Sequence, residues 1–270
     1  MDKKQSGEDF ESFKKQELRD SNFQKRHQRR FFNFNNVTIR EGDEGMSASD
    51  PRSPSKLEDH SAASTDGKTL VFFKNLEDHL IRFIQEADVV VGCVAWVTSE
   101  PILKALAKKK GVSLVVQKED FLRPDLLPND DWKRRLRQLY DNLPYHLNSS
   151  DLPGLIALDV HTIEPIRCVG DANMDKLSAC PRSHHKFVLF CKAEVGCQCN
   201  ECQERLHFEM EFLREASRNI THIHPYAVWT GSFNFTRNAT MSFENAVVLS
   251  DPNIVHAYYH EYGQIVFLSE

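Results

Sequence analysis

From Thr69 onward, short continuous runs of hydrophobic residues alternate with segments in which hydrophobic residues recur at helical spacing. This pattern predicts short strands followed by helices. Val89 to Val97 is a continuous apolar run rich in β-branched residues, typical of a strand covered on both faces. Between such runs, apolar residues recur at helical spacing. The pattern predicts strands at 70–72, 89–97 and 112–116, and helices at 76–84 and 101–106, the second starting at Pro101. This order of elements predicts an α/β domain in which helices cover a sheet.

The C-terminal half repeats this alternation. It predicts a helix from Trp132, a strand over 163–169, a strand after His184 and a final helix over 253–267. In the final helix, one apolar stripe is expected to pack on the sheet: Ile254, Tyr258, Tyr262 and Ile265.

The first 66 residues lack this apolar periodicity and are rich in polar, charged and proline residues. Such a segment buries too little surface to offset its ordering entropy, so we expect a disordered tail over 1–66 and a folded domain over 67–270. The basic run 25–30, which two phenylalanines follow, suits either a solvated tail or a contact with nucleic acid or a partner.

Two pairs of polar residues lie next to apolar runs in the C-terminal part of the chain. His184 and Lys186 are two residues apart ahead of an apolar strand, so both side chains should lie on one face. A histidine beside a fixed cation suits a phosphate. After the apolar Ala227–Trp229 run, Gly231 permits close backbone approach, and Ser232 and Asn234 repeat the two-residue spacing.

Together these segments resemble the phospholipase D superfamily, whose signature reads H-x-K, four residues, D, then G-S-x-N. Glu244 matches the acidic residue that often follows this signature. Cys191 stands where the family has its aspartate, and the two halves of the motif are further apart than usual. The resemblance covers about residues 68–270 and implies a mixed β-sheet with helices on both faces. We expect an inserted cysteine-rich and helical segment over 191–225.

The resemblance implies a phosphodiesterase that needs no metal or cofactor for catalysis. His184 would attack phosphorus and form a phosphohistidine, which water then hydrolyses. Lys186 and Asn234 would hold the phosphate oxygens, Ser232 would order the phosphate, and Glu244 would orient His184. The chain contains one copy of each half-motif, whereas the mechanism needs two histidines across one phosphate. A homodimer with a composite active site is therefore expected.

The insertion contains a closely spaced cysteine series that suits one structural zinc: Cys191, Cys197, Cys199 and Cys202. His207 or Cys180 could replace one ligand, and free thiols in a surface loop are the alternative. A helix is expected after the series, over 203–218.

Composition narrows the substrate only in part. The net charge of −5 gives no global basic field, so any nucleic-acid surface must be local, as in the basic residues 133–137 of one predicted helix; a solvated helix face is the alternative. We expect no membrane-spanning run, no signal peptide and a cytoplasmic protein with reduced thiols. A nuclease is the leading prediction. A cardiolipin-type lipid hydrolase and a degenerate nucleic-acid-binding module remain open.

Overall fold

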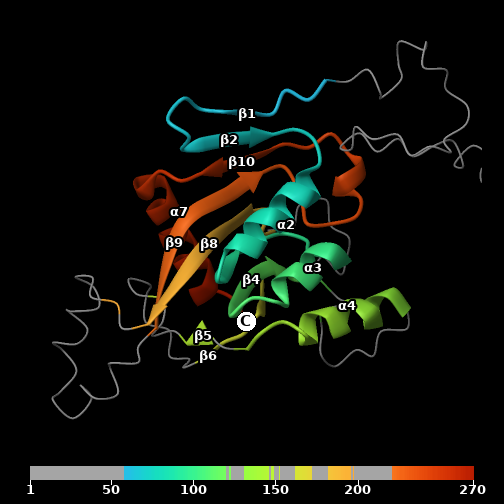
Figure 1. Cartoon of the computed structure of the whole chain (residues 1–270). Helices are drawn as coiled ribbons and strands as arrows, with labels where there is room; N and C mark the ends of the chain where they lie inside the picture. The colour runs from blue at the N-terminus through green and yellow to red at the C-terminus, as the bar shows by residue number, and fades with distance from the viewer. Residues whose placement is uncertain are drawn as a thin grey trace, which may run out of the picture. The chain divides into compact units, whose positions relative to one another are not determined.

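A computed structural model describes residues 58–119, 122, 131–145, 147–148, 152, 162–171, 182–195, 197 and 221–270. Their main feature is an eight-stranded mixed sheet in the order β1-β2-β10-β9-β8-β3-β4-β7 (Figure 1). Its strands are β1 (Ala62–Ala63), β2 (Thr69–Phe72), β3 (Val89–Val94), β4 (Gly111–Gln117), β7 (Ile166–Val169), β8 (Lys186–Val195), β9 (Thr221–Gly231) and β10 (Ala246–Leu249). β3, β4 and β7 run parallel to one another, whereas the other neighbouring pairs are antiparallel.

Helices cover both faces of this sheet, which confirms the expected fold class. On one face lie α2 (Leu76–Glu86), α3 (Glu100–Leu106) and α4 (Asp131–Asp141), and on the other lies α7 (Pro252–Phe267) (Figure 1). The short strands β5 (Leu147–Asn148) and β6 (Thr162–Ile163) pair separately, and η5 (Ala239–Met241) is a short 3₁₀ helix.

Period-two alternation along the central strands assigns each side chain to one of two apolar layers. In β8, Val188 and Phe190 face α2, whereas Phe187, Leu189 and Cys191 face α7. Aromatic rings fill the α2 layer: Phe83 of α2 lies 5.4 Å from Phe190 between ring centroids. The sheet is therefore buried on both sides at its centre, as the continuous apolar runs predicted.

Local sequence signals place the helix ends. Ser99 caps α3 by accepting a hydrogen bond from the Ile102 backbone N–H, and proline follows in the first turn. Asp251 caps α7 through the N–H groups of Asn253 and Ile254. Both helices start within about two residues of their predicted positions, the usual uncertainty of a helix boundary.

The packed stripe of α7 differs from the prediction. The buried residues are Val255, Tyr259, Tyr262, Gly263 and Val266, so only Tyr262 was expected among them. Ile254 is exposed. The helix is apolar on more than one stripe, so periodicity alone left its rotation undecided; contact with the sheet selects the buried side.

Four predicted boundaries also differ from the structure. β1 lies before residue 67, within the segment predicted as a tail. β3 ends at Val94, and the predicted strand over 163–169 divides into β6 and β7. The hairpin of β8 and β9 extends to Val195 and resumes at Thr221, so both ends of the expected insertion 191–225 are sheet. The helix predicted over 203–218 lies outside the described residues.

Candidate active site

The two polar motifs meet at one end of the central strands, where β8 starts and β9 finishes. β8 begins at Lys186, and antiparallel pairing sets its second residue, Phe187, opposite Thr230 near the end of β9. Gly231 closes β9 and pairs with Ala246, the first residue of β10. The motif halves, distant in sequence, are therefore held together by the register of three strands.

His184 and Lys186 form the contact that their spacing predicted. Lys186 Nζ lies 3.1 Å from His184 Nε2 and donates a hydrogen bond of 3.0 Å to the His184 carbonyl. Desolvation lowers the pKa of His184 below the ordinary 6.5, and the positive charges of Lys186 and Arg182 lower it further. Desolvation also lowers the pKa of Lys186, although Glu244 opposes this shift. The lowered pKa of His184 favours the neutral imidazole in this pair.

Ser232 connects the second motif to Glu244. Its hydroxyl donates to the Glu244 carboxylate and accepts from the Asn245 backbone N–H at 3.1 Å. The backbone N–H of Ser232 donates to the Asn245 carbonyl, also at 3.1 Å. Glu244 was expected to accept from the His184 ring. Its hydrogen bond in the described residues is with Ser232, and orientation of His184 by Glu244 stays a prediction.

Gly231 and Asn234 occupy the tightest positions of the second motif. A Cβ added to Gly231 would lie 2.3 Å from the Asn245 carbonyl oxygen, and φ is +153°. Only glycine fits where β9 meets β10. The Oδ1 atom of Asn234 is buried and has no hydrogen-bond partner within the described part of the chain. Buried polar atoms are nearly always satisfied, so this amide is a candidate ligand contact.

Two residues that sequence reasoning did not select position the histidine. The Trp96 ring meets the His184 ring edge-on at 5.6 Å, and Trp96 Nε1 donates to Glu119 Oε1 at 3.1 Å. Gln117 is buried; its Oε1 accepts from the Ser183 backbone N–H at 2.7 Å. Trp96 follows β3 and Gln117 ends β4. The carboxyl ends of neighbouring parallel strands lie side by side. Polar side chains at the ends of β3 and β4 could therefore have been predicted to lie near one site.

His185 points away from this group, as alternation predicts. Its Nε2 lies 3.7 Å from Glu261 Oε1 on α7, and its ring meets Phe187 edge-on. His185 therefore lies on the α7 side of the sheet and does not supply a second histidine to the site.

Cys191, the first member of the predicted cysteine series, lies in the core, and zinc binding by the series stays a prediction. Cys191 is fully buried within the α7 layer, and burial raises the pKa of its thiol. It packs as a small apolar residue among the side chains of the α7 layer. Cys197 instead lies with His222 and His224, whose ligand atoms and its own are all within 4.8 Å of one another. Cys180, Cys199, Cys202 and His207 lie outside the described residues.

None of the helices in the described part of the chain combines the length and apolar character that crossing a membrane requires. The helix α4 contains the basic residues 133–135 and 137, and its buried residue is Leu136. Arg134 contacts Asp131, and Lys133 Nζ lies 5.6 Å from the Trp132 ring centroid.

Comparison with known proteins gives distant similarities. No family model matches the chain. An uncharacterized protein of Acanthamoeba polyphaga mimivirus, L381, is 25% identical over 231 residues, which are 80% of this chain and 71% of the viral protein.

Solved structures with lower identity also match. Nuc of Salmonella typhimurium, a phospholipase D family member, is 15% identical, with a TM-score of 0.41 over 75% of this chain and 95% of its own. NucT of Helicobacter pylori is 12% identical, with a TM-score of 0.44 over 75% of this chain and 97% of its own. The archaeal chromatin protein TrmBL2 is 10% identical, with a TM-score of 0.34 over 77% of this chain and 55% of its own.

Proposed function

We propose that this protein is a phosphodiesterase that cleaves through a phosphohistidine intermediate. The observation that carries the proposal is the pair at the start of β8, in which Lys186 Nζ lies 3.1 Å from His184 Nε2. An imidazole with a lowered pKa is largely unprotonated near neutral pH and has a lone pair for attack. The adjacent ammonium attracts the phosphate that the imidazole attacks.

In the proposed reaction, His184 forms a bond to phosphorus as the bond from phosphorus to the leaving oxygen breaks. A second, protonated histidine gives its proton to that oxygen. Water then attacks the phosphohistidine, releasing His184, while the second histidine, now neutral, takes a proton from the water. Lys186 and the amide of Asn234, rotated to present Nδ2, would stabilise the charge on the non-bridging oxygens. Ser232, held by Glu244 and Asn245, would order the phosphate.

The second histidine comes from a second copy of the chain in this proposal. His185 faces α7, so the described residues of one chain offer His184 alone at this end of the central strands. A two-fold axis beside the start of β8 would place two His184 rings on opposite sides of one phosphate. Each chain would then contribute one half of a single composite site.

A nucleic acid is the substrate class we favour. Tyr140 of α4 donates a 2.6 Å hydrogen bond to the carbonyl of Val97, one residue beyond Trp96, which anchors the basic helix α4 to the rim of the site. Lysine and arginine on such a helix suit successive phosphates of a strand. Activity on cardiolipin-type lipids is the alternative outcome of the test.

The test is digestion of labelled single- and double-stranded DNA and RNA, with cardiolipin vesicles in parallel. We expect cleavage of a nucleic acid and its loss by at least four orders of magnitude in His184→Ala, because attack and protonation are each worth roughly a hundredfold or more. His185→Ala is the matched control and should stay active. Trapped phosphohistidine on His184 would support the mechanism, whereas equal activity of the two variants would refute it.

Mixed dimers test the composite site separately. Wild-type chains paired with His184→Ala chains should be nearly inactive, because one histidine is missing from the shared site. A strictly monomeric form that cleaves as fast per chain as the bulk protein would exclude this arrangement and leave the rest of the proposal to the digestion assay.

A further inference from the structure

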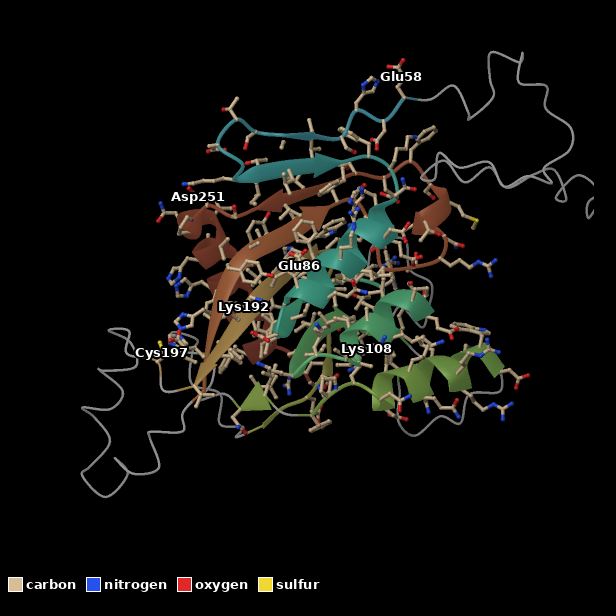
Figure 2. The ribbon with its side chains drawn as sticks, in the orientation of Figure 1. Glu58, Glu86, Lys108, Lys192, Cys197 and Asp251 are labelled. Carbon is tan, nitrogen blue, oxygen red and sulfur yellow. The ribbon has the colours of Figure 1, made fainter. Side chains whose placement is uncertain are left out.

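The opposite end of the β8–β9 hairpin contains a second cluster of reactive side chains. Cys197 Sγ lies 3.2 Å from His224 Nε2, and the His222 and His224 rings lie 3.6 Å apart between centroids. Figure 2 shows Cys197 at this end of the hairpin, with Lys192 further along the strand. Cys197 and His222 are buried, and His224 is half-buried.

The strand register explains why these side chains converge. His222 and His224 alternate with Ile223, which packs in the α7 layer, so both histidines lie on the opposite face. The antiparallel partner of His222 is Glu194, and Glu194 Oε2 lies 3.6 Å from His224 Nε2. A register shift between Phe190 and Cys191 precedes this part of the hairpin. The pairing therefore brings Glu194 and the nearby Cys197 to the two histidines.

We infer that Cys197, His222, His224 and Glu194 bind one structural zinc ion. One thiolate, two imidazoles and a carboxylate are the donor types that zinc accepts in a tetrahedral site. Zinc–ligand bonds of about 2.0–2.3 Å put neighbouring donor atoms about 3.3–3.6 Å apart. The distances of 3.2 Å from Cys197 Sγ and 3.6 Å from Glu194 Oε2 to His224 Nε2 are close to this, and the ligand atoms of Cys197, His222 and His224 all lie within 4.8 Å of one another. Glu194 lies outside that group of three, so its exposed carboxylate would turn toward the ion to complete the shell. The inferred ligand set replaces the cysteine series as the zinc site.

The ion would act on structure and not on phosphate chemistry. β8 contains ten residues from Lys186 to Val195, which span roughly 30 Å at about 3.3 Å per residue. The zinc site is therefore far from His184. Its position at the end of the hairpin, where β8 finishes and β9 starts, suits a clamp that joins the two strands.

Elemental analysis and X-ray absorption on the full chain test this inference. Protein purified without added metal should contain about one zinc per chain. Its first coordination shell should contain one sulfur, with nitrogen and oxygen in the other positions. Cys197→Ser, His222→Ala and His224→Ala should each lower the zinc content to near zero after dialysis.

Two controls separate this site from other thiols and histidines. Cys191→Ala should keep its zinc, because that thiol packs in the α7 layer. His260→Ala should also keep it, although His256 and His260 on α7 form another close histidine pair, with Nε2 atoms 2.7 Å apart. Loss of zinc in either control would overturn the assignment.

The wild-type protein gives a test that does not depend on variant folding. Cobalt exchanged into the site should give the visible spectrum of a tetrahedral ion and a single-thiolate charge-transfer band. A folded, reduced wild-type chain with a zinc content near zero would overturn the proposal. So would a first shell with two or more sulfurs.

Discussion

The two ends of the β8–β9 hairpin use the same geometry for different chemistry. At each end, side chains two residues apart lie together: His184, just before β8, with Lys186 at its start, and His222 with His224 in β9. At the first end the neighbour is a cation on an accessible edge, which favours an anion. At the second end the neighbours are a thiol and a carboxylate, which favour a metal cation. Spacing creates the pair, and its surroundings select the ligand.

The difference also separates the expected consequences of mutation. The start of β8 is accessible, because His184 and Ser232 are exposed, so changes there should act mainly on catalysis. The other end buries Cys197 and His222, so changes there should act mainly on folding stability. The following predictions test that separation.

Lysine substitutions at the two ends of β8 should give the largest contrast. Lys186→Met should lower kcat/KM by about 10²–10³-fold, because it removes a cation beside the developing charge. Lys192 donates to the Glu86 carbonyl and lies over the Tyr226 ring, far from the site. Lys192→Met should therefore cleave normally. Steady-state kinetics decide this, and equal losses in both variants would contradict the separation.

Glycine substitution tests the junction of β9 and β10 beside the candidate active site. Gly231→Ala should cost about 3 kcal/mol or more of unfolding free energy, because its Cβ would overlap the Asn245 carbonyl. Gly67 is the matched control: its φ is +71°, but no atom lies within 4 Å of an added Cβ. Gly67→Ala should cost only about 1–2 kcal/mol of backbone strain. Denaturant unfolding measures both; a smaller cost at Gly231 would mean that the strands can separate.

Zinc removal should affect stability and leave the chemistry intact. Losing a ligand present at about 100–1,000 times its Kd costs about 3–4 kcal/mol. In a domain of this size, that corresponds to a fall in Tm on the order of 10 °C. Cleavage by protein that remains folded in a chelator should continue at close to its full rate. Loss of activity with folding unchanged, restored by magnesium, would indicate a metal-dependent nuclease instead.

The pH profile should show the smallest shift. Attack requires one neutral His184 and leaving-group protonation requires a protonated His184 from the second copy, so kcat/KM should pass through a maximum with pH. Desolvation and nearby positive charge place its acid limb below pH 6.5. Arg182→Gln removes one of the charges that lower this pKa, so the acid limb should move to higher pH. Arg134→Gln on α4 should leave the limb in place. An acid limb that moves to lower pH in Arg182→Gln would contradict the assignment of His184.

The sequence predicted an element correctly where its local pattern is compatible with one kind of secondary structure. The β-branched run of β3 and the capped starts of α3 and α7 need no distant partner to define them, so these elements agree with the structure apart from their ends. Side chains alternate between the two faces of an extended chain. This alternation predicts that His184 lies with Lys186 and that His185 lies on the other face, as the structure shows. That the His184 segment lies beside the Gly231 segment did not follow from any local pattern. Only the resemblance to a known family implied it.

The sequence alone determined which residues share a strand face, which segments are apolar and where glycine is required. Tertiary structure decided the remaining contacts, because they depend on strand register and on which side of an element is covered. It turned α7 so that Val255 and Tyr259, rather than Ile254, face the sheet. It buried Cys191 among apolar residues and brought Cys197 to His222 and His224. Closeness in sequence suggested the cysteine series as zinc ligands. The structure instead gathers Cys197 with His222 and His224, which lie more than twenty positions away across the hairpin, and the zinc inference rests on this group.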